Sequence, residues 1–132
     1  MSLHVGRLED NSLVQIFPSG FRHITPDKTA KTMKFEGKIV KGITKGRQMV
    51  IALAGGDIIY YELDQSGSLS ETAQTSLDSE VVALDFSPIE KGRIRSNFLA
   101  VAFNDGTARI FELNGTEDCL KVLSAQNMKS EI

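Results

Sequence analysis

The sequence predicts an all-β fold, namely a partial WD40-like β-propeller of about two and three-quarter four-stranded antiparallel blades. Three observations lead to this prediction: a repeated pattern, short apolar runs and a composition rich in turn residues. The 132 residues include 11 glycines, 3 prolines and no tryptophan, which suits a turn-rich β protein. With 41% hydrophobic and 24% charged residues, the chain can bury a core and is not an intrinsically disordered sequence.

The repeat joins two long stretches of the chain. Residues 49–64 align without a gap to residues 99–114, at an offset of about 50 positions. The identical pairs include Ala52 with Ala102, Gly56 with Gly106, and Glu62 with Glu112. A third copy, residues 13–24, fits about 36 positions before the first of these stretches. Each copy consists of an apolar run, a glycine-bearing turn and a second apolar run, which predicts a β-hairpin.

The turns and the runs agree with this assignment. The Ala-Gly-Gly turn at 54–56 and the Asn-Asp-Gly turn at 104–106 provide residues that accept a positive φ at little steric cost. The apolar runs, such as 49–53 and 81–84, are nearly continuous rather than alternating. Short continuous runs of this kind indicate strands that are buried on both faces, as in a sheet stacked between two others.

Further strands are expected around each hairpin. These strands cover residues 38–44, 69–77, 81–87 and 119–125. The resulting blades are an incomplete first blade at 1–36, a second at 37–78 and a third at 79–127, followed by a tail at 128–132. Propellers close with about four to eight blades, so we expect a piece of a longer protein.

No catalytic, cofactor or metal site is expected from the residues. His4 and His23 are the two histidines, and Cys119, the one cysteine, follows two acids that would raise rather than lower a thiol pKa. This set excludes an intramolecular disulfide and the familiar zinc spacings. No glycine-rich phosphate-binding motif occurs, and Asn114-Gly115-Thr116 is interpreted as a turn rather than a glycosylation site.

Net charge and hydropathy exclude two further classes of protein, those that bind polyanions with the whole chain and those that span a membrane. The formal net charge is −2, so the chain as a whole is not a polyanion-binding protein. No apolar run approaches the roughly 20 residues that span a bilayer, and no membrane partner is expected.

A basic segment lies between residues 28 and 47, and Glu36 is its one carboxylate. Its members are Lys28, Lys31, Lys34, Lys38, Lys41, Lys45 and Arg47. These side chains could contact nucleic-acid phosphates. Alternatively, they form a solvated rim on an outer strand and the following loop, where lysines discourage edge-to-edge pairing. We favour the rim, because Phe35 is the one aromatic residue in the segment and base stacking needs more.

A second basic cluster consists of Arg93 and Arg95, with Lys91 beside them, in the loop between the first two strands of the last blade. Such loops protrude and are common partner contacts. Contact with a partner and a contribution to solubility alone are both open for this cluster.

Three separated stretches, 13–24, 46–67 and 95–110, resemble in the same order the family of the large propeller subunit of splicing factor 3b, part of the U2 small nuclear ribonucleoprotein. Its superfamily includes the large subunits of the damaged-DNA-binding protein and of the cleavage and polyadenylation specificity factor. The turn at 54–56 and the run at 61–67 look more like the splicing subunit. A departure is Met33 or Phe35, where that subunit usually has a tryptophan.

The resemblance implies the middle one of three propellers and a noncatalytic protein-interaction scaffold. It implies action in the nucleus, in pre-mRNA splicing and branch-site recognition. The expected partners are the HEAT-repeat subunit and the small zinc-finger subunit, which dock mainly on the flanking propellers. RNA contact would be indirect or weak, and no catalytic residue is carried over.

Two other functions are kept as alternatives. One is a propeller that contacts RNA or DNA through the basic segment, and the other is a ubiquitin-ligase adaptor like the damaged-DNA-binding relative. Because the faces of terminal blades expose apolar surface that a closed ring hides, we expect the isolated chain to self-associate.

Overall fold

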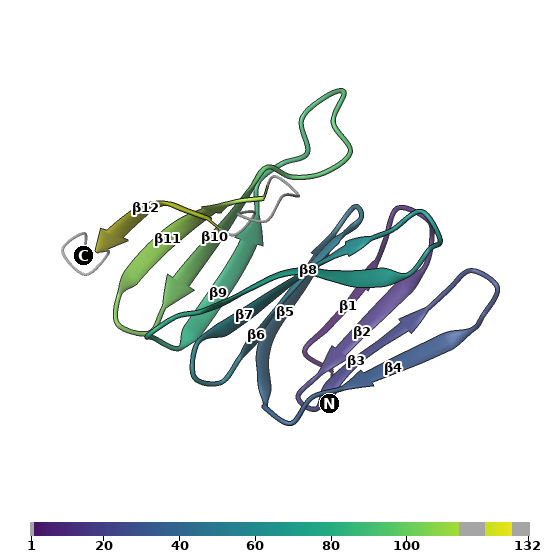
Figure 1. Cartoon of the computed structure of the whole chain (residues 1–132), viewed down its shortest axis with the longest axis horizontal. Coiled ribbons are helices and arrows are strands. Elements are labelled where there is room, and N and C mark those ends of the chain that lie inside the picture. Colours follow the sequence, from purple (N-terminus) through teal and green to yellow (C-terminus); the bar gives the residue numbers. More distant parts are fainter. Residues whose placement is uncertain (1, 114–120, 128–132) are drawn as a thin grey trace.

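The computed structural model describes residues 2–113 and 121–127, which form three antiparallel sheets (Figure 1). No helix occurs in these residues, and so none is long and apolar enough to cross a membrane. Each sheet has four strands in sequential order. The all-β, propeller-like fold predicted from the sequence is therefore confirmed.

The first sheet consists of β1 (His4–Arg7), β2 (Leu13–Phe17), β3 (Gly20–Ile24) and β4 (Ala30–Lys34). The sequence predicts an incomplete first blade at residues 1–36. The four strands of this first sheet correct that expectation. Strand β1 has no apolar run, because Val5 is the one apolar side chain in its sequence His-Val-Gly-Arg. Half-buried and exposed residues alternate along it. It forms through pairing with β2, in a register that sequence patterns alone do not reveal.

The second and third sheets carry the long repeat. Their strands are β5 (Ile39–Lys45), β6 (Gln48–Leu53), β7 (Asp57–Leu63), β8 (Leu69–Ser76), β9 (Val81–Phe86), β10 (Phe98–Phe103), β11 (Thr107–Glu112) and β12 (Lys121–Asn127). Hairpin β6–β7 is equivalent to hairpin β10–β11, as the repeat predicts. The expected beginning of the last strand at Cys119, the triplet at 114–116 and the tail at 128–132 lie outside the described residues. The division into blades at 37 and 79 stays a proposal.

The middle sheet is buried on both faces. On β6, Met49 and Ile51 pack toward the first sheet, whereas Val50 and Ala52 pack toward the third. All four side chains are fully buried. On the first-sheet side, Tyr61 meets Phe21 edge-on, with ring centroids 5.2 Å apart. The continuous apolar run in this strand is therefore explained by two separate cores, one on each face.

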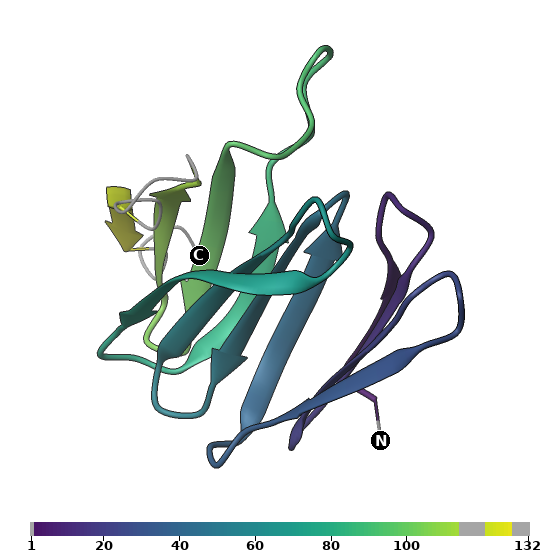
Figure 2. The same cartoon turned by 45° about the vertical axis from the view of Figure 1, so that its right-hand side comes forward.

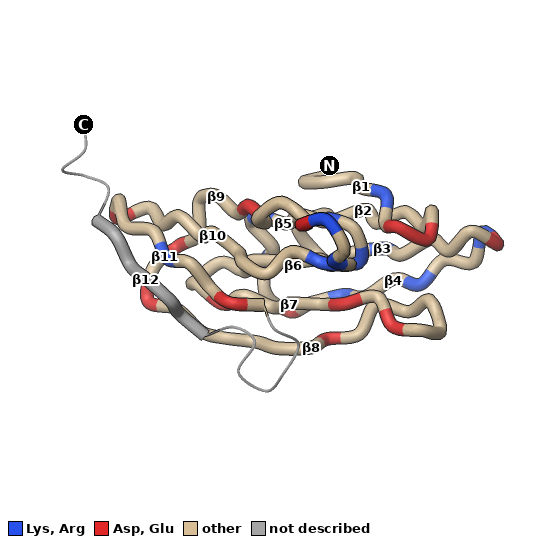
Figure 3. The backbone as a smooth tube through the Cα atoms, turned by 90° about the horizontal axis from the view of Figure 1, so that it is seen from above, with Lys and Arg blue, Asp and Glu red and all other residues tan. Residues whose placement is uncertain are grey.

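The sheets are stacked face to face, with their first strands adjacent. Strand β5 contacts both β1 and β9, and β4 and β8 lie at the opposite edges of their sheets (Figure 3). In the third sheet, β12 is the edge strand opposite β9. The outward faces of the two terminal sheets remain open: Val5 is 63% exposed, and Phe98 is 38% exposed. Gln48, the position equivalent to Phe98 in the middle sheet, is fully buried. These open faces are where the self-association expected of the chain, still a prediction, would occur.

Candidate functional site

Every second loop of the chain lies at the same end of the sheets. They are the loops at residues 8–12, 25–29, 46–47, 64–68 and 87–97. The last of these, between β9 and β10, projects well beyond the sheets (Figures 1 and 2). Because hairpin loops vary without disturbing the sheets beneath them, this end is a natural place for contacts with partners.

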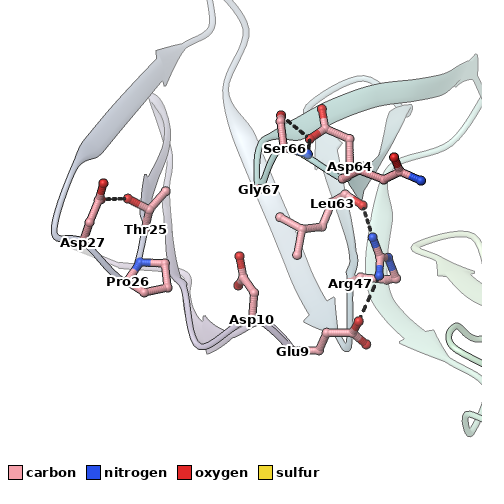
Figure 4. A pocket seen from close by; sticks show the side chains of 11 residues that line it. Glu9, Asp10, Thr25, Pro26, Asp27, Arg47, Leu63, Asp64, Ser66 and Gly67 are labelled. Atoms are coloured by element: carbon pink, nitrogen blue, oxygen red, sulfur yellow. Dashed lines mark hydrogen bonds and ion pairs between the residues drawn. The ribbon is translucent and has the colours of Figure 1, made fainter.

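A groove of about 700 Å³ opens at this end, between the loops of the first and second sheets (Figure 4). Glu9, Asp10, Asp27 and Asp64 contribute carboxylates to its lining, and Arg47 contributes a cation. The groove is therefore predominantly acidic, which does not favour binding of a polyanion here.

Two of these carboxylates stabilise the turns that carry them. Asp64 accepts hydrogen bonds from the hydroxyl of Ser66 (2.6 Å) and from the backbone N–H of Ser68 (3.0 Å). These bonds hold the pKa of Asp64 well below its usual range. Asp27 accepts from the hydroxyl of Thr25 and from the backbone of Thr29, and its pKa is likewise lowered. Both groups are charged at neutral pH and act as turn caps.

Arg47 joins the first two sheets at the groove. One guanidinium nitrogen donates to Glu9 at 2.9 Å, and the other donates to the backbone carbonyl of Leu63 at 2.8 Å. The backbone N–H of Glu9 also donates to the carbonyl of Gly46 at 2.8 Å. The turn before β6 is therefore fastened to the loop after β1.

The structure separates the lysines of the basic segment. Lys28, Lys31 and Lys34 lie on β4 or just before it, at the outer edge of the first sheet. Lys38 follows in the loop, whereas Lys41 and Lys45 lie on β5, the innermost strand of the second sheet. The sequence could not reveal this division, because β4 and β5 are consecutive in the chain but occupy opposite edges of neighbouring sheets. The role of these residues in contacting partners stays a prediction.

The arginines of the second basic cluster differ in their surroundings. Arg93 is exposed on the projecting loop, and its backbone N–H closes a turn onto Glu90 at 2.9 Å. Arg95 is half-buried and forms an ion pair with Glu62 at 2.6 Å. Arg95 therefore fastens the loop to the second sheet, a contact that sequence reasoning did not foresee.

Beside this ion pair lies a buried polar network that the sequence analysis missed. The side-chain amide of Gln48 accepts from the N–H of Ser96 (2.7 Å) and donates to its carbonyl (3.0 Å), so both backbone groups are satisfied. The same amide donates to the Tyr60 hydroxyl at 2.9 Å, which in turn donates to Glu62 at 2.5 Å. Burial, reinforced by Glu62, raises the pKa of Tyr60. The one available signal was a glutamine directly before the apolar run at 49–53.

Both histidines serve the fold. His23 is buried on β3, and its Nε2 shares a hydrogen bond with the Ser12 hydroxyl at 2.9 Å. His4 makes a similar bond of 2.8 Å to Thr44 across the first two sheets. Burial lowers the pKa of both imidazoles. Among the residues that the structure describes, no group of three or more His, Cys, Asp or Glu side chains could hold a metal ion.

The lowered histidine pKa values predict a loss of stability in mild acid. Below the ordinary histidine pKa of about 6.5, the unfolded chain binds protons that the folded chain does not. The free energy of unfolding should therefore fall as the pH decreases from 7.5 to 5.5, and urea titrations at the two pH values measure this. A His23→Gln variant should show a smaller decrease; an unchanged decrease in that variant would contradict the assignment to His23.

Three neighbouring antiparallel sheets, stacked face to face with their first strands adjacent, define the chain as part of a β-propeller. The family described as the RSE1/DDB1/CPSF1 second beta-propeller matches residues 1–131. The chain belongs to this family. The resemblance to this family inferred from the sequence is thereby confirmed, and the matching model is that of a second propeller.

Several curated relatives cover nearly the whole chain. Spliceosome-associated protein 130 A of Arabidopsis thaliana is 43% identical over 131 residues, which is 98% of this chain and 11% of the relative. Splicing factor 3B subunit 3 of Danio rerio is 39% identical over 133 residues, again 98% of this chain and 11% of the relative. The chain therefore spans only about a tenth of the length of these relatives.

A solved structure supports the fold independently. The periplasmic gluconolactonase PpgL of Pseudomonas aeruginosa is similar, with a TM-score of 0.69 over 96% of this chain and 40% of its own. Sequence identity is 16%, so the likeness concerns the fold alone.

Proposed function

We propose that the chain is a noncatalytic protein-interaction scaffold in the nuclear pre-mRNA splicing machinery. Support comes from membership in the family and from relatives whose names are those of splicing factors. By resemblance, the assembly would be the U2 particle at the branch site, and the partners would be the HEAT-repeat and small zinc-finger subunits of splicing factor 3b.

The observation that best supports the scaffold role is the set of contacts that hold the loops at this end of the sheets in place. Arg47 joins the first two sheets, and the Gln48–Ser96 contact joins the second and third. Loops held in this way present a fixed surface, which lowers the entropy lost when a partner binds. His4 hydrogen-bonds the Thr44 hydroxyl and His23 hydrogen-bonds the Ser12 hydroxyl. Ser12 is fully buried, so this serine–histidine pair is not accessible to a substrate as a catalytic triad is.

Direct nucleic-acid binding is the weaker alternative. The basic residues are divided between an outer edge and an inner strand, and an acidic groove lies at the loop end. A continuous groove along the phosphate backbone would need these cations on one surface.

Isolation of the tagged chain from nuclear extract tests the scaffold role. Quantitative mass spectrometry should find splicing factor 3b subunits enriched over cullins, relative to a tag-only control. Enrichment of cullins without splicing subunits would instead support the ubiquitin-ligase adaptor. Binding of neither group would contradict the scaffold role of this stretch.

Oligonucleotide affinity measured at a series of salt concentrations distinguishes a scaffold from a nucleic-acid-binding protein. A scaffold should bind a single-stranded oligonucleotide weakly, and simultaneous charge reversal of Lys31, Lys34 and Lys38 should change little. A phosphate-binding surface would lose affinity steeply with salt, and the triple charge reversal would abolish binding.

A further inference from the structure

We propose that the free edge of β4, together with the groove beneath it, binds an extended protein segment with an acidic residue two positions from a bulky apolar residue. The inference rests on the proposed scaffold role and names the chemistry of one partner. The segment would add a strand to the first sheet, a known mode of peptide recognition.

Strand β4 offers an open edge. It is the last strand in the order of the first sheet, and all five of its residues are exposed. In sequence these residues are Ala30, Lys31, Thr32, Met33 and Lys34. Exposure along the whole strand leaves room for a further strand beside it.

The backbone bonds at the two ends of β4 show which groups face this edge. The N–H of Phe35 donates to the carbonyl of Ser19, and the N–H of Thr25 donates to the carbonyl of Thr29, each at 2.9 Å. In an antiparallel pair, bonded and non-bonded positions alternate. The residues whose N–H and C=O groups point to the free edge are therefore Ala30, Thr32 and Lys34. An added strand would bond to these groups.

The other residues of β4 face a groove toward the second sheet. Met33 pairs with Phe21, and Lys31 pairs with His23, so their side chains share the face that packs inward. A groove of about 330 Å³ lies among these four residues and Leu69 of β8. Met33 is 49% exposed although its neighbour Phe21 is buried. A large apolar side chain seated here would cover Met33, which favours binding.

The charge of the edge selects an acidic partner. Lys31 lines the groove, and Lys28 and Lys34 lie nearby along the chain. Lysines on an edge oppose pairing with a second basic β4 strand, but they attract a carboxylate. The outer strand of the second sheet, β8, carries Glu71 and no lysine, so an acidic segment should prefer β4. Because side chains two apart share one face of a strand, an acid at Lys31 places the apolar residue near Met33.

The test uses a fluorescein-labelled peptide with Glu-Thr-Leu at the centre of a threonine-rich strand sequence. Fluorescence polarisation with the full chain should give a Kd of about 100 µM or lower. Lys31→Glu and Met33→Glu should each weaken binding at least tenfold. Lys41→Glu makes the same charge change at an exposed position on β5, in the second sheet, and is the matched control, with an expected effect below threefold. A peptide with lysine in place of its glutamate should recover binding to the Lys31→Glu variant.

Amide shifts in NMR spectra show where the peptide binds. Shifts at Ala30, Thr32 and Lys34 are expected on titration, with far-UV circular dichroism showing that each variant is folded. The proposal is wrong if the peptide does not bind, if Lys41→Glu weakens binding as much as Lys31→Glu, or if a single-stranded oligonucleotide competes fully at this edge. These outcomes leave the isolation of splicing subunits untouched, so failure here is distinguishable from failure of the scaffold role.

Discussion

A Gly56→Val variant is expected to lose more than about 4 kcal/mol of its free energy of unfolding, enough to leave much of the chain unfolded. A Cβ atom at Gly56 would lie 2.4 Å from the carbonyl oxygen of Leu77 and 2.8 Å from that of Ser79. Both contacts are with backbone, so no side-chain rotation relieves them. The φ of +104° adds strain for any β-branched residue.

Gly55 is the matched control for this prediction. Its φ of +99° is nearly the same, but nothing lies within 4 Å of the position that its Cβ would occupy. Gly55→Val should therefore cost only the backbone strain, about 1–3 kcal/mol. Urea unfolding followed by circular dichroism measures both variants. Equal losses in the two would mean that the close approach of Leu77 and Ser79 to Gly56 is not what makes the glycine necessary.

The hairpins could be predicted because the determinants of a hairpin are local. Gly56 and Gly106 have positive φ in the structure, as the turns at 54–56 and 104–106 require. Residues 49–53 alternate between two cores, which produces a continuous apolar run that is readable without any knowledge of the neighbouring sheets. Local backbone geometry and burial on both faces thus leave a direct trace in the sequence.

The features that could not be predicted depend on distant parts of the chain. Strand β1 forms by pairing with β2 and has no apolar run of its own. Gln48 and Ser96 are 48 positions apart, and neither residue type signals its partner. The separation of Lys31 from Lys41 follows from β4 and β5 lying at opposite edges of neighbouring sheets. Sequence patterns report the period of an element and not the elements that it will contact.

A Gln48→Ala variant is expected to lose about 3–5 kcal/mol, because it leaves buried groups unpaired and creates a cavity. Gln48 and Ser96 are fully buried, and both backbone groups of Ser96 depend on this amide. The loop that follows β9 should open more often in the variant. Limited trypsin digestion should then cleave faster after Arg93 and Arg95, and the free energy of unfolding follows from urea titration.

Two further variants show whether the amide itself is responsible. Gln15→Ala is the control, because Gln15 is only half-buried and donates to the hydroxyl of Ser2 at 2.7 Å; its expected loss is below about 0.5 kcal/mol. Gln48→Glu keeps the shape, but as a carboxylate it cannot donate to the carbonyl of Ser96.

The Gln48→Glu variant should also be sensitive to pH. Burial would raise the pKa of the new carboxyl group above its value in the unfolded chain, so the folded state would bind the proton more readily. The stability deficit relative to the parent should therefore be larger at pH 7.5 than at pH 5.5. A deficit independent of pH, together with unchanged trypsin cleavage at Arg93 and Arg95, would show that Gln48 fills space between the sheets without holding the loop.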